Sequence, residues 1–418
     1  MRFTLIILLL TAIKIIFSLL IKQDIFLYED HDIAVNLLKT GNFFYDCDGA
    51  RHYSFQFPIY PFMLFMIYKI SNINLFCVIL YHIFLNMLTA FMLPCVFQKW
   101  LGVFNLNESL KKYSGTIVKI SVLIFLLHPI INYYIFLKIH PFIENLFFFT
   151  LLNFLMFRFL EKNNFQNLFL YAIAFGFAVM DRTTLAISIL PFLILSKNRF
   201  GFLRLTRNTF ILFLVTGFVN APWLIRNFHK DNIVGFASSG RDLWKGSIPD
   251  SEGSNYLNSG LNYYSALSTK DVNYIGTLTP AGQNDFFINK FVKNVKENPS
   301  GYLKLYLLKL KNFWMFRKLI GNEYPFFIQQ FIPFYKFFFL TILILAFTSC
   351  FFIRKTWILM TMPVALSLFH AFFYVETRHR LLIEPLLIFL ALISAAKLYS
   401  LFKKSNYNTL RKFIVSFA

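Results

Sequence analysis

The sequence has few of the residues that soluble enzymes use to build metal and redox sites. It contains four cysteines in 418 residues, and Cys77, Cys95 and Cys350 fall inside apolar runs. This spacing gives neither a disulfide framework nor a set of metal ligands. The sequence also has no glycine-rich phosphate loop, no HExxH motif, no CxxC pair and no internal repeat. These absences exclude P-loop pumps, zinc proteases and thiol redox enzymes.

Charged residues are also scarce. Only 15% of the residues are charged, whereas 57% are hydrophobic and 57 residues are phenylalanine. This composition predicts a chain embedded in a bilayer through many apolar helices. The net charge of +21 comes from basic residues scattered between apolar runs rather than from one basic domain. We therefore attribute the charge to contacts with the membrane surface and exclude a nucleic-acid partner.

The apolar runs predict an all-α polytopic membrane protein with roughly ten crossings. The first run lacks a cleavage site and is expected to remain as an anchor. The apolar stretch 57–70 is too short to cross a core of about 30 Å, so we expect it to lie at the interface. The predicted spans cover residues 3–21, 75–97, 116–137, 142–160, 168–180, 185–195, 210–224, 331–353, 357–375 and 381–401.

These spans divide the chain into three parts. Residues 1–225 form a transmembrane bundle with a first outer loop at 22–73, residues 226–330 form a large outer loop, and residues 331–418 form the last spans and a basic tail. Short cytoplasmic loops collect Lys and Arg, and this rule places both termini inside and both loops outside. In the second half of the large loop, at 285–319, apolar residues at helical spacing alternate with basic residues that include Arg317 and Lys318. This pattern predicts amphipathic juxtamembrane helices, broken at Pro299 and Gly301.

Three acidic residues in the first outer loop are candidate catalytic groups. Glu29, Asp30 and Asp32 precede a short amphipathic helix that is expected to end at Gly41. A carboxylate near the low dielectric of a membrane gains basicity, so one of them could take a proton from an acceptor hydroxyl or amine. Two alternatives stay open. Asp30 or Asp32 could cap the helix, and the cluster could hold a divalent cation.

Five segments form an ordered series of motifs. They are the acidic loop followed by FPIYP at 57–61, MDRTTLAISILP at 180–191, NAPWLIRNF at 220–228 with SSGRDLWKGS at 238–247, ENPSGYLKLYLLKLKNFW at 297–314 and RHRLLIEPLLIFLA at 378–391. The series resembles the GT-C superfamily of membrane glycosyltransferases, most closely the bacterial branch related to protein mannosyltransferases and the lipid A aminoarabinose transferase. The sequence departs from that branch at Thr183, where a proline is usual, and at Ile33 or Ala34, where a tyrosine is frequent.

The resemblance implies a GT-C-type bundle that transfers a sugar from a polyprenyl-phosphate donor, with inversion, at the outer face of the inner (plasma) membrane. The acceptor would be a lipid, an envelope glycan or a protein. Asp30 is the first choice for the base, with Glu29 second and Asp32 third.

The donor phosphate needs cationic partners, and arginine offers paired N–H groups to phosphate oxygens. Arg380 and Arg226 match the family motifs best, so we expect them to face a shared cavity and bind the phosphate. Arg182 and Arg378 are further candidates. Each of the four could instead anchor a helix end at the interface.

Three other residues are possible substrate contacts. His140 and Glu144 are spaced to share one face of a helix beginning at the outer surface, where the family commonly has a second acid, and Trp244 could line a sugar pocket. A role in the core or in capping would explain His140 and Glu144 about as well, and a role as a buried loop anchor would explain Trp244 nearly as well. No cofactor is implied with certainty, and metal dependence stays open. The alternative function is a transporter or flippase of a lipid-linked sugar, which predicts inverted repeats and charges at mid-membrane.

Overall fold

The computed structural model describes residues 2–20, 24–315 and 332–415. Helices account for 79% of it, and among the described residues the only paired strands form the small hairpin of β1 (Tyr45–Cys47) and β2 (Ala50–His52). The prediction of an all-α membrane protein is confirmed at this level. Residues 21–23, where the predicted first outer loop begins, and residues 316–331, where the predicted large outer loop ends, lie outside the described residues. So do Arg317 and Lys318 of the predicted amphipathic segment.

Within the described ranges, six helices are long and apolar enough to cross a membrane. A seventh crossing results if the bent pair α6 (Ser114–Leu127) and α7 (Pro129–Leu137) is one span. The six helices are α1 (Arg2–Leu20), α4 (Leu75–Phe104), α8 (Phe142–Lys162), α11 (Phe202–Asp231), α17 (Ile332–Phe352) and α19 (Glu384–Val415).

The remaining three predicted spans form shorter helices. They are α9 (Phe165–Asp181), α10 (Ile189–Phe200) and α18 (Trp357–Phe372), with 17, 12 and 16 residues. The run predicted at 185–195 is divided, because the 3₁₀ helix η1 (Thr183–Ser188) occupies its first part. A crossing of about 30 Å needs roughly 20 helical residues, so the expected number of about ten spans is not shown.

The bend between α6 and α7 has a local cause. Pro129 has no backbone N–H and disfavours helical geometry in the residue before it. His128 is accordingly extended, and the two helices differ in direction by 41°. The His128 side chain then caps α7, because its Nδ1 accepts a hydrogen bond from the Ile131 amide at 3.4 Å.

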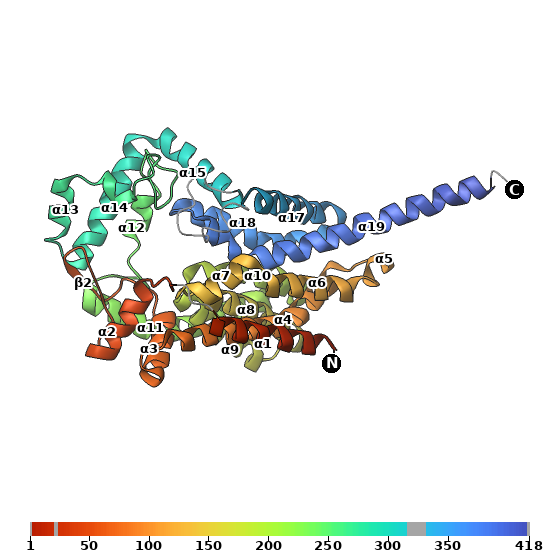
Figure 1. Cartoon of the computed structure of the whole chain (residues 1–418), viewed down its shortest axis with the longest axis horizontal. Helices are drawn as coiled ribbons and strands as arrows, with labels where there is room; N and C mark the ends of the chain where they lie inside the picture. Colours follow the sequence, from red (N-terminus) through yellow and green to blue (C-terminus); the bar gives the residue numbers. More distant parts are fainter. Residues whose placement is uncertain (1, 21–23, 316–331, 416–418) are drawn as a thin grey trace.

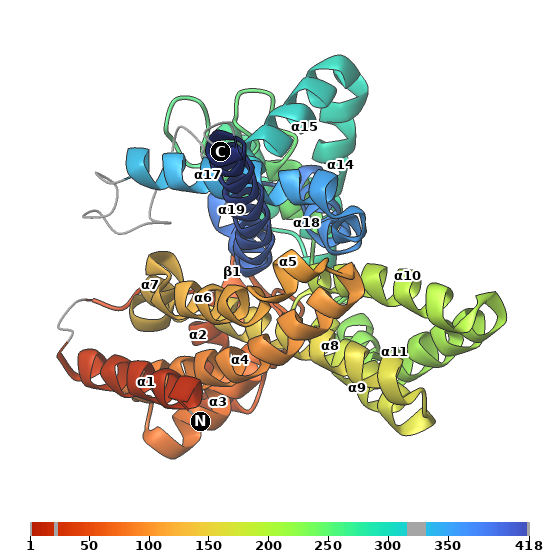
Figure 2. The same ribbon diagram turned by 90° about the vertical axis from the view of Figure 1, so that its right-hand side faces the viewer.

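The helices form an elongated bundle with both termini at one end (Figure 1). At the opposite end lie the hairpin, α2 (Glu29–Thr40), α3 (Ile59–Ser71), α12 (Gly240–Lys245), α13 (Thr269–Ile275) and α14 (Pro280–Glu297), which we call the cap. The two predicted outer loops therefore meet at the same end. A view along the bundle shows α10 and α11 projecting to one side and α1 lying on the other (Figure 2).

The chain returns from the cap to the bundle through α15 (Pro299–Trp314). Helix α14 ends at Glu297 and α15 begins at Pro299, with Asn298 between them capping α15 through the Gly301 amide. The predicted pair of helices with a break at Pro299 is therefore present up to residue 315, whereas the predicted break at Gly301 is wrong, because Gly301 lies in the first turn of α15.

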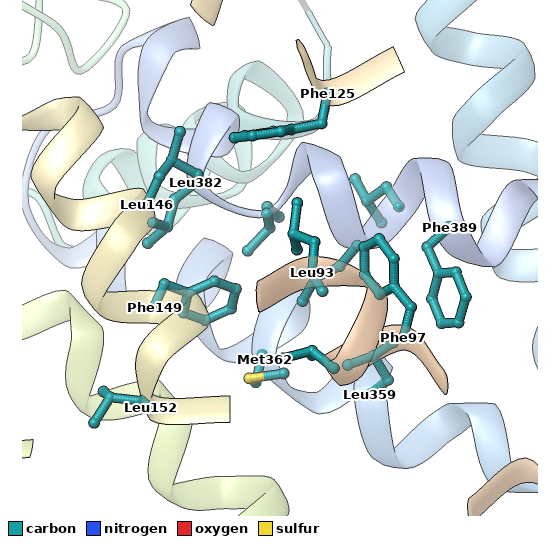
Figure 3. Packing of buried hydrophobic residues seen from close by; sticks show 14 of the residues in the cluster. Leu93, Phe97, Phe125, Leu146, Phe149, Leu152, Leu359, Met362, Leu382 and Phe389 are labelled. Atoms are coloured by element: carbon teal, nitrogen blue, oxygen red, sulfur yellow. The ribbon is translucent and has the colours of Figure 1, made fainter. Parts of the chain in front are cut away.

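Aromatic and aliphatic side chains from distant parts of the sequence fill the bundle core (Figure 3). Phe97 of α4 and Phe389 of α19 stack with ring centroids 4.2 Å apart and planes inclined by 7°. Leu146 and Phe149 of α8 and Leu359 and Met362 of α18 belong to the same core. This core fixes the last helices against the centre of the bundle.

Helix α2 forms where the sequence predicts it. It ends at Gly41, which has φ of 72° and closes the helix in the left-handed conformation that glycine adopts at low cost. The acidic residues stand in its first turn, where negative charge is favourable. The expected capping by Asp30 or Asp32 is wrong, because the N-cap is Tyr28 and no side-chain cap bond forms.

Candidate functional site

The candidate site begins with Asp30, the most deeply placed of the three acids in the first outer loop. Its side chain is 4% exposed, whereas Glu29 is half-buried and Asp32 is exposed. The α-helical spacing explains this difference, since α2 packs against the bundle through the face that also carries Ile33 and Ala34. Asp30 is therefore the candidate base that faces the interior.

Two further carboxyl groups approach Asp30 from other helices. Glu144 lies in the first turn of α8, and Asp181 is the last residue of α9. Asp181 interacts electrostatically with Glu144, Arg182 and Asp30. Both carboxyl groups are buried. We call Asp30, Glu144 and Asp181 the acid cluster.

The acid cluster has fewer partners than buried carboxyl groups normally require. Glu144 Oε1 accepts a hydrogen bond from the Tyr81 hydroxyl at 2.9 Å. Glu144 Oε2 and both carboxyl oxygens of Asp181 have no hydrogen-bond partner among the described residues. Unpaired buried oxygens cost free energy, so the cluster favours bound protons or a ligand that donates hydrogen bonds.

Burial gives Asp30 the electrostatic character expected of a base. Desolvation raises the pKa of its carboxyl group well above the ordinary value, and the negative charge of Glu29 acts in the same direction. Arg182 opposes this effect and Glu144 adds to it. A higher pKa means a stronger affinity for a proton once the carboxyl group is ionised.

A small cavity lies beside the acid cluster, with Arg182 and Arg378 in its walls. Its volume is about 20 Å³, which suffices for one water molecule. Arg182 follows Asp181 directly, so the cavity and the cluster adjoin. The lining residues are His140, Phe142, Asn145, Arg182, Thr184, His370, Arg378, His379 and Leu382.

Arg378 reaches the cavity from the 3₁₀ helix η5 (Thr377–Leu382) that leads into α19. Its Nη2 lies 2.6 Å from Glu376 Oε2. The contact is an ion pair rather than an aligned hydrogen bond, since Oε2 meets no donor at hydrogen-bond geometry. Arg378 Nε has no partner among the residues described. Arg378 thus retains donors for an anion.

His140 adds a neutral hydrogen-bond donor to the wall. Burial lowers the pKa of its imidazole well below the ordinary value, and the positive charges of Arg378 and Arg182 lower it further. Its Nδ1 accepts a hydrogen bond from the Phe142 amide at 3.2 Å, so the proton of the neutral ring is on Nε2. His140 precedes α8, and the expectation that it shares a helix face with Glu144 is wrong.

The two arginines that the motifs favoured lie elsewhere. Arg380 is fully buried, with Nε 2.9 Å from Glu384 Oε1 and Nη1 donating to the Met315 carbonyl at 2.8 Å. Arg226 donates to the carbonyls of Tyr53 at 2.7 Å and Phe43 at 2.8 Å. The expectation that Arg380 and Arg226 face a shared cavity is wrong, because each is committed to protein groups in a different part of the molecule.

Arg226 belongs to a clamp at the end of α11. Asp231 Oδ2 accepts hydrogen bonds from the amides of Tyr53 and Ser54, at 2.8 and 2.7 Å, and from the Ser54 hydroxyl at 2.6 Å. The guanidinium of Arg226 lies over the Trp223 ring, 4.3 Å from its centroid. This clamp fastens the segment between the acid-bearing helix α2 and α3 to α11.

Trp244 lies in the apolar core of the cap. Its ring packs against Phe287 at 5.2 Å and Tyr263 at 6.0 Å between centroids, and 3% of the residue is exposed. It does not line the cavity. Trp244 is therefore a buried anchor of the loop, which was the structural alternative to a contact with the sugar.

The described residues contain no group of three or more His, Cys, Asp or Glu side chains arranged to hold a metal ion. Neither Asp181 nor Glu376 was among the candidate site residues taken from the sequence. The signal was present for Asp181, since it directly precedes Arg182 in a family-like motif.

The chain matches no family model, no curated protein and no solved structure. The resemblance to the GT-C transferases therefore stays a prediction from the sequence motifs.

Proposed function

We propose that the chain is a GT-C-type glycosyltransferase that moves a sugar from a polyprenyl-phosphate donor to a lipid, glycan or protein acceptor. One observation carries the proposal. Arg182 and Arg378 line one cavity, and the buried acid cluster, with Asp30, adjoins it. Transfer from a lipid phosphate needs this combination, because the leaving phosphate requires cations and the acceptor requires a base.

The chemistry assigns one role to each group. Asp30 takes the proton of the acceptor hydroxyl or amine, whose oxygen or nitrogen forms a bond to the anomeric carbon. The bond between that carbon and the phosphate oxygen breaks on the opposite face, so the configuration inverts. Arg182 and Arg378 stabilise the charge on the departing polyprenyl phosphate, and the Nε2 proton of His140 can donate to the same anion.

The proposed location follows from the same assignment. The donor's polyprenyl chain stays in lipid, so the reaction takes place where the cap meets the membrane. We place the cap at the outer face of the plasma membrane, in agreement with the predicted distribution of Lys and Arg.

A direct test uses the purified protein in nanodiscs with polyprenyl-phosphate sugars and candidate acceptors. Mass spectrometry should detect an acceptor that has gained one glycosyl mass, together with free polyprenyl phosphate. Asp30→Asn should lower the rate at which both products form by a factor of roughly 10² to 10⁴. Comparing the envelope glycans of a deletion strain with those of its parent should name the sugar and the acceptor. A protein that moves labelled donor across vesicles without releasing polyprenyl phosphate would be a flippase, and the transferase proposal would be wrong.

A further inference from the structure

The large loop of the cap touches the bundle at the turn that precedes Arg378. The Val375 amide donates to the Gly253 carbonyl at 2.8 Å. The buried ammonium group of Lys309, in α15, joins the same surfaces, donating to the carbonyls of Gly246 at 2.6 Å and Phe373 at 2.9 Å. The loop is thus fixed on residues 373–375 by one direct hydrogen bond and by Lys309, which bridges Gly246 and Phe373.

Glycine is required at both ends of this contact. A Cβ atom on Gly246 would lie 1.8 Å from the Phe373 carbonyl oxygen. Gly253 has φ of +68°, and a Cβ there would lie 2.4 Å from the Lys309 side chain. No other residue permits such a close approach without displacing the neighbour. The sequence is therefore specifically adapted to this docking of the loop.

Asn255, which also lies in the large loop, contacts Glu376, the ion-pair partner of Arg378. The side-chain amide of Asn255 donates to Glu376 Oε1, while Glu376 Oε2 forms the ion pair with Arg378. The two oxygens of one buried carboxylate therefore connect the loop to a wall of the cavity. Lys245 Nζ donates to Asn255 Oδ1 at 3.4 Å, which orients the amide.

This arrangement constrains Arg378 through its neighbour. The Glu376 side chain also accepts a hydrogen bond from the His379 backbone amide. Together with the Asn255 amide, this contact limits the rotation of the carboxylate and so the direction in which its other oxygen faces. Because the contact of Arg378 with Glu376 is an ion pair without hydrogen-bond alignment, the guanidinium can change its orientation if the carboxylate rotates.

We infer that Asn255 and Glu376 are positioning residues for the cavity, so that docking of the large loop sets the direction of Arg378 toward a bound phosphate. Neither residue lines the cavity. The inference rests on the proposed function only in taking a polyprenyl phosphate as the anion.

The experiment measures the binding of undecaprenyl phosphate and the kinetics of transfer for Asn255→Ala. We expect the dissociation constant and KM to rise about tenfold, as for one lost hydrogen bond to a charged group, while kcat changes little. Asn258→Ala is the matched control, because Asn258 lies in the same loop, is exposed, and bonds to Asp250. It should bind as the wild type does.

A double-mutant cycle separates positioning from a general effect on the fold. In an Arg378→Ala background, Asn255→Ala should change undecaprenyl phosphate affinity less than twofold, because the group through which it acts is gone. A tenfold loss in that background, or an equal loss in Asn258→Ala, would overturn the inference.

Structures of the wild type and Asn255→Ala decide the question independently of activity. Arg378 should leave its wild-type orientation in the variant, and an unchanged guanidinium would overturn the inference. If the wild type binds no undecaprenyl phosphate, the proposed function fails, and the orientation of Arg378 still tests the positioning role.

Discussion

Arg380 and Glu384 lie one helical turn apart and form an ion pair sealed from solvent, with Nε 2.9 Å from Oε1. The other carboxyl oxygen of Glu384 accepts a hydrogen bond from the Tyr335 hydroxyl at 2.9 Å and lies 2.9 Å from His128 Nε2. Since His128 stands at the bend between α6 and α7, this one carboxylate connects the bend to α17 and α19. The group therefore holds four helices together.

This pair predicts that Arg380 acts on stability rather than on donor binding. Arg380→Ala leaves Glu384 as a buried charge without its cation, which typically costs about 3 to 5 kcal/mol. We expect a lower thermal midpoint in detergent and a lower folded yield. The double substitution Arg380→Met with Glu384→Gln should recover much of the loss. An Arg380→Ala protein as stable as the wild type, with KM for the donor raised, would restore the phosphate-binding role.

Asp30→Asn should lower turnover by a factor of roughly 10² to 10⁴, which is the usual contribution of a general base. The substitution keeps the shape of the side chain and removes only its ability to take a proton. Undecaprenyl phosphate should still bind. Asp32→Asn, on the exposed side of the same helical turn, should be nearly as active as the wild type. Loss of turnover in Glu29→Gln with retention in Asp30→Asn would assign the base to Glu29.

The raised pKa of Asp30 predicts opposite effects of pH on activity and stability. The base acts in its ionised form, so turnover should rise with pH, along a limb that lies well above the ordinary Asp value of about 4. At a pH between the pKa of Asp30 in the unfolded chain and its higher pKa in the folded chain, Asp30 keeps its proton only in the folded chain. Its contribution to stability is therefore complete below about pH 4 and is lost as the pH rises through the folded pKa.

Profiles of turnover and of thermal midpoint against pH check both effects. Asp30→Asn removes the titrating group, so the fall in midpoint across this range should be smaller in the variant. Identical midpoint profiles for the two proteins would show that Asp30 has an ordinary pKa in the folded state.

Arg226→Ala should release the segment between α2 and α3 without a direct effect on donor binding. Arg226 and Asp231 together hold the backbone at Phe43, Tyr53 and Ser54. Hydrogen exchange should increase at the amides of Tyr53 and Ser54 in Asp231→Asn and, to a smaller extent, in Arg226→Ala. Arg182→Ala is the control, because it should weaken undecaprenyl phosphate binding and leave these amides protected. Unchanged exchange in both clamp variants would contradict the clamp.

The predicted topology requires Asn258 and Lys111 to face opposite sides of the membrane. Both positions are exposed. In a variant without the four native cysteines, a cysteine at 258 should react with an impermeant maleimide in intact cells, and a cysteine at 111 only after permeabilisation. The reverse pattern would place the cap in the cytoplasm and remove the basis for an outer active site.

The sequence predicted the local features of this protein better than its long-range contacts. Helix α2, its end at Gly41 and the break between α14 and α15 were predictable, because glycine, proline and apolar spacing act over a few residues. The lengths of the shorter helices were not predictable, since an apolar run such as 185–195 does not show where a 3₁₀ turn replaces the α-helix.

The site shows the same limit. Asp30, Arg182 and Arg378 were all candidates, but their sequence neighbourhoods could not show which arginines line the cavity. Arg380 lies four residues before Glu384 on the same chain segment, at the spacing at which helical side chains meet. That spacing could have indicated an ion pair. The partners of Arg226, in contrast, lie 173 and 183 residues away, and no local pattern reveals them.

The volume of the cavity has a kinetic consequence. Because about 20 Å³ holds one water molecule, any larger ligand has to bind a state in which the walls have moved apart. The measured affinity then equals the intrinsic affinity multiplied by the fraction of molecules in that open state. Association should accordingly be slower than diffusion allows.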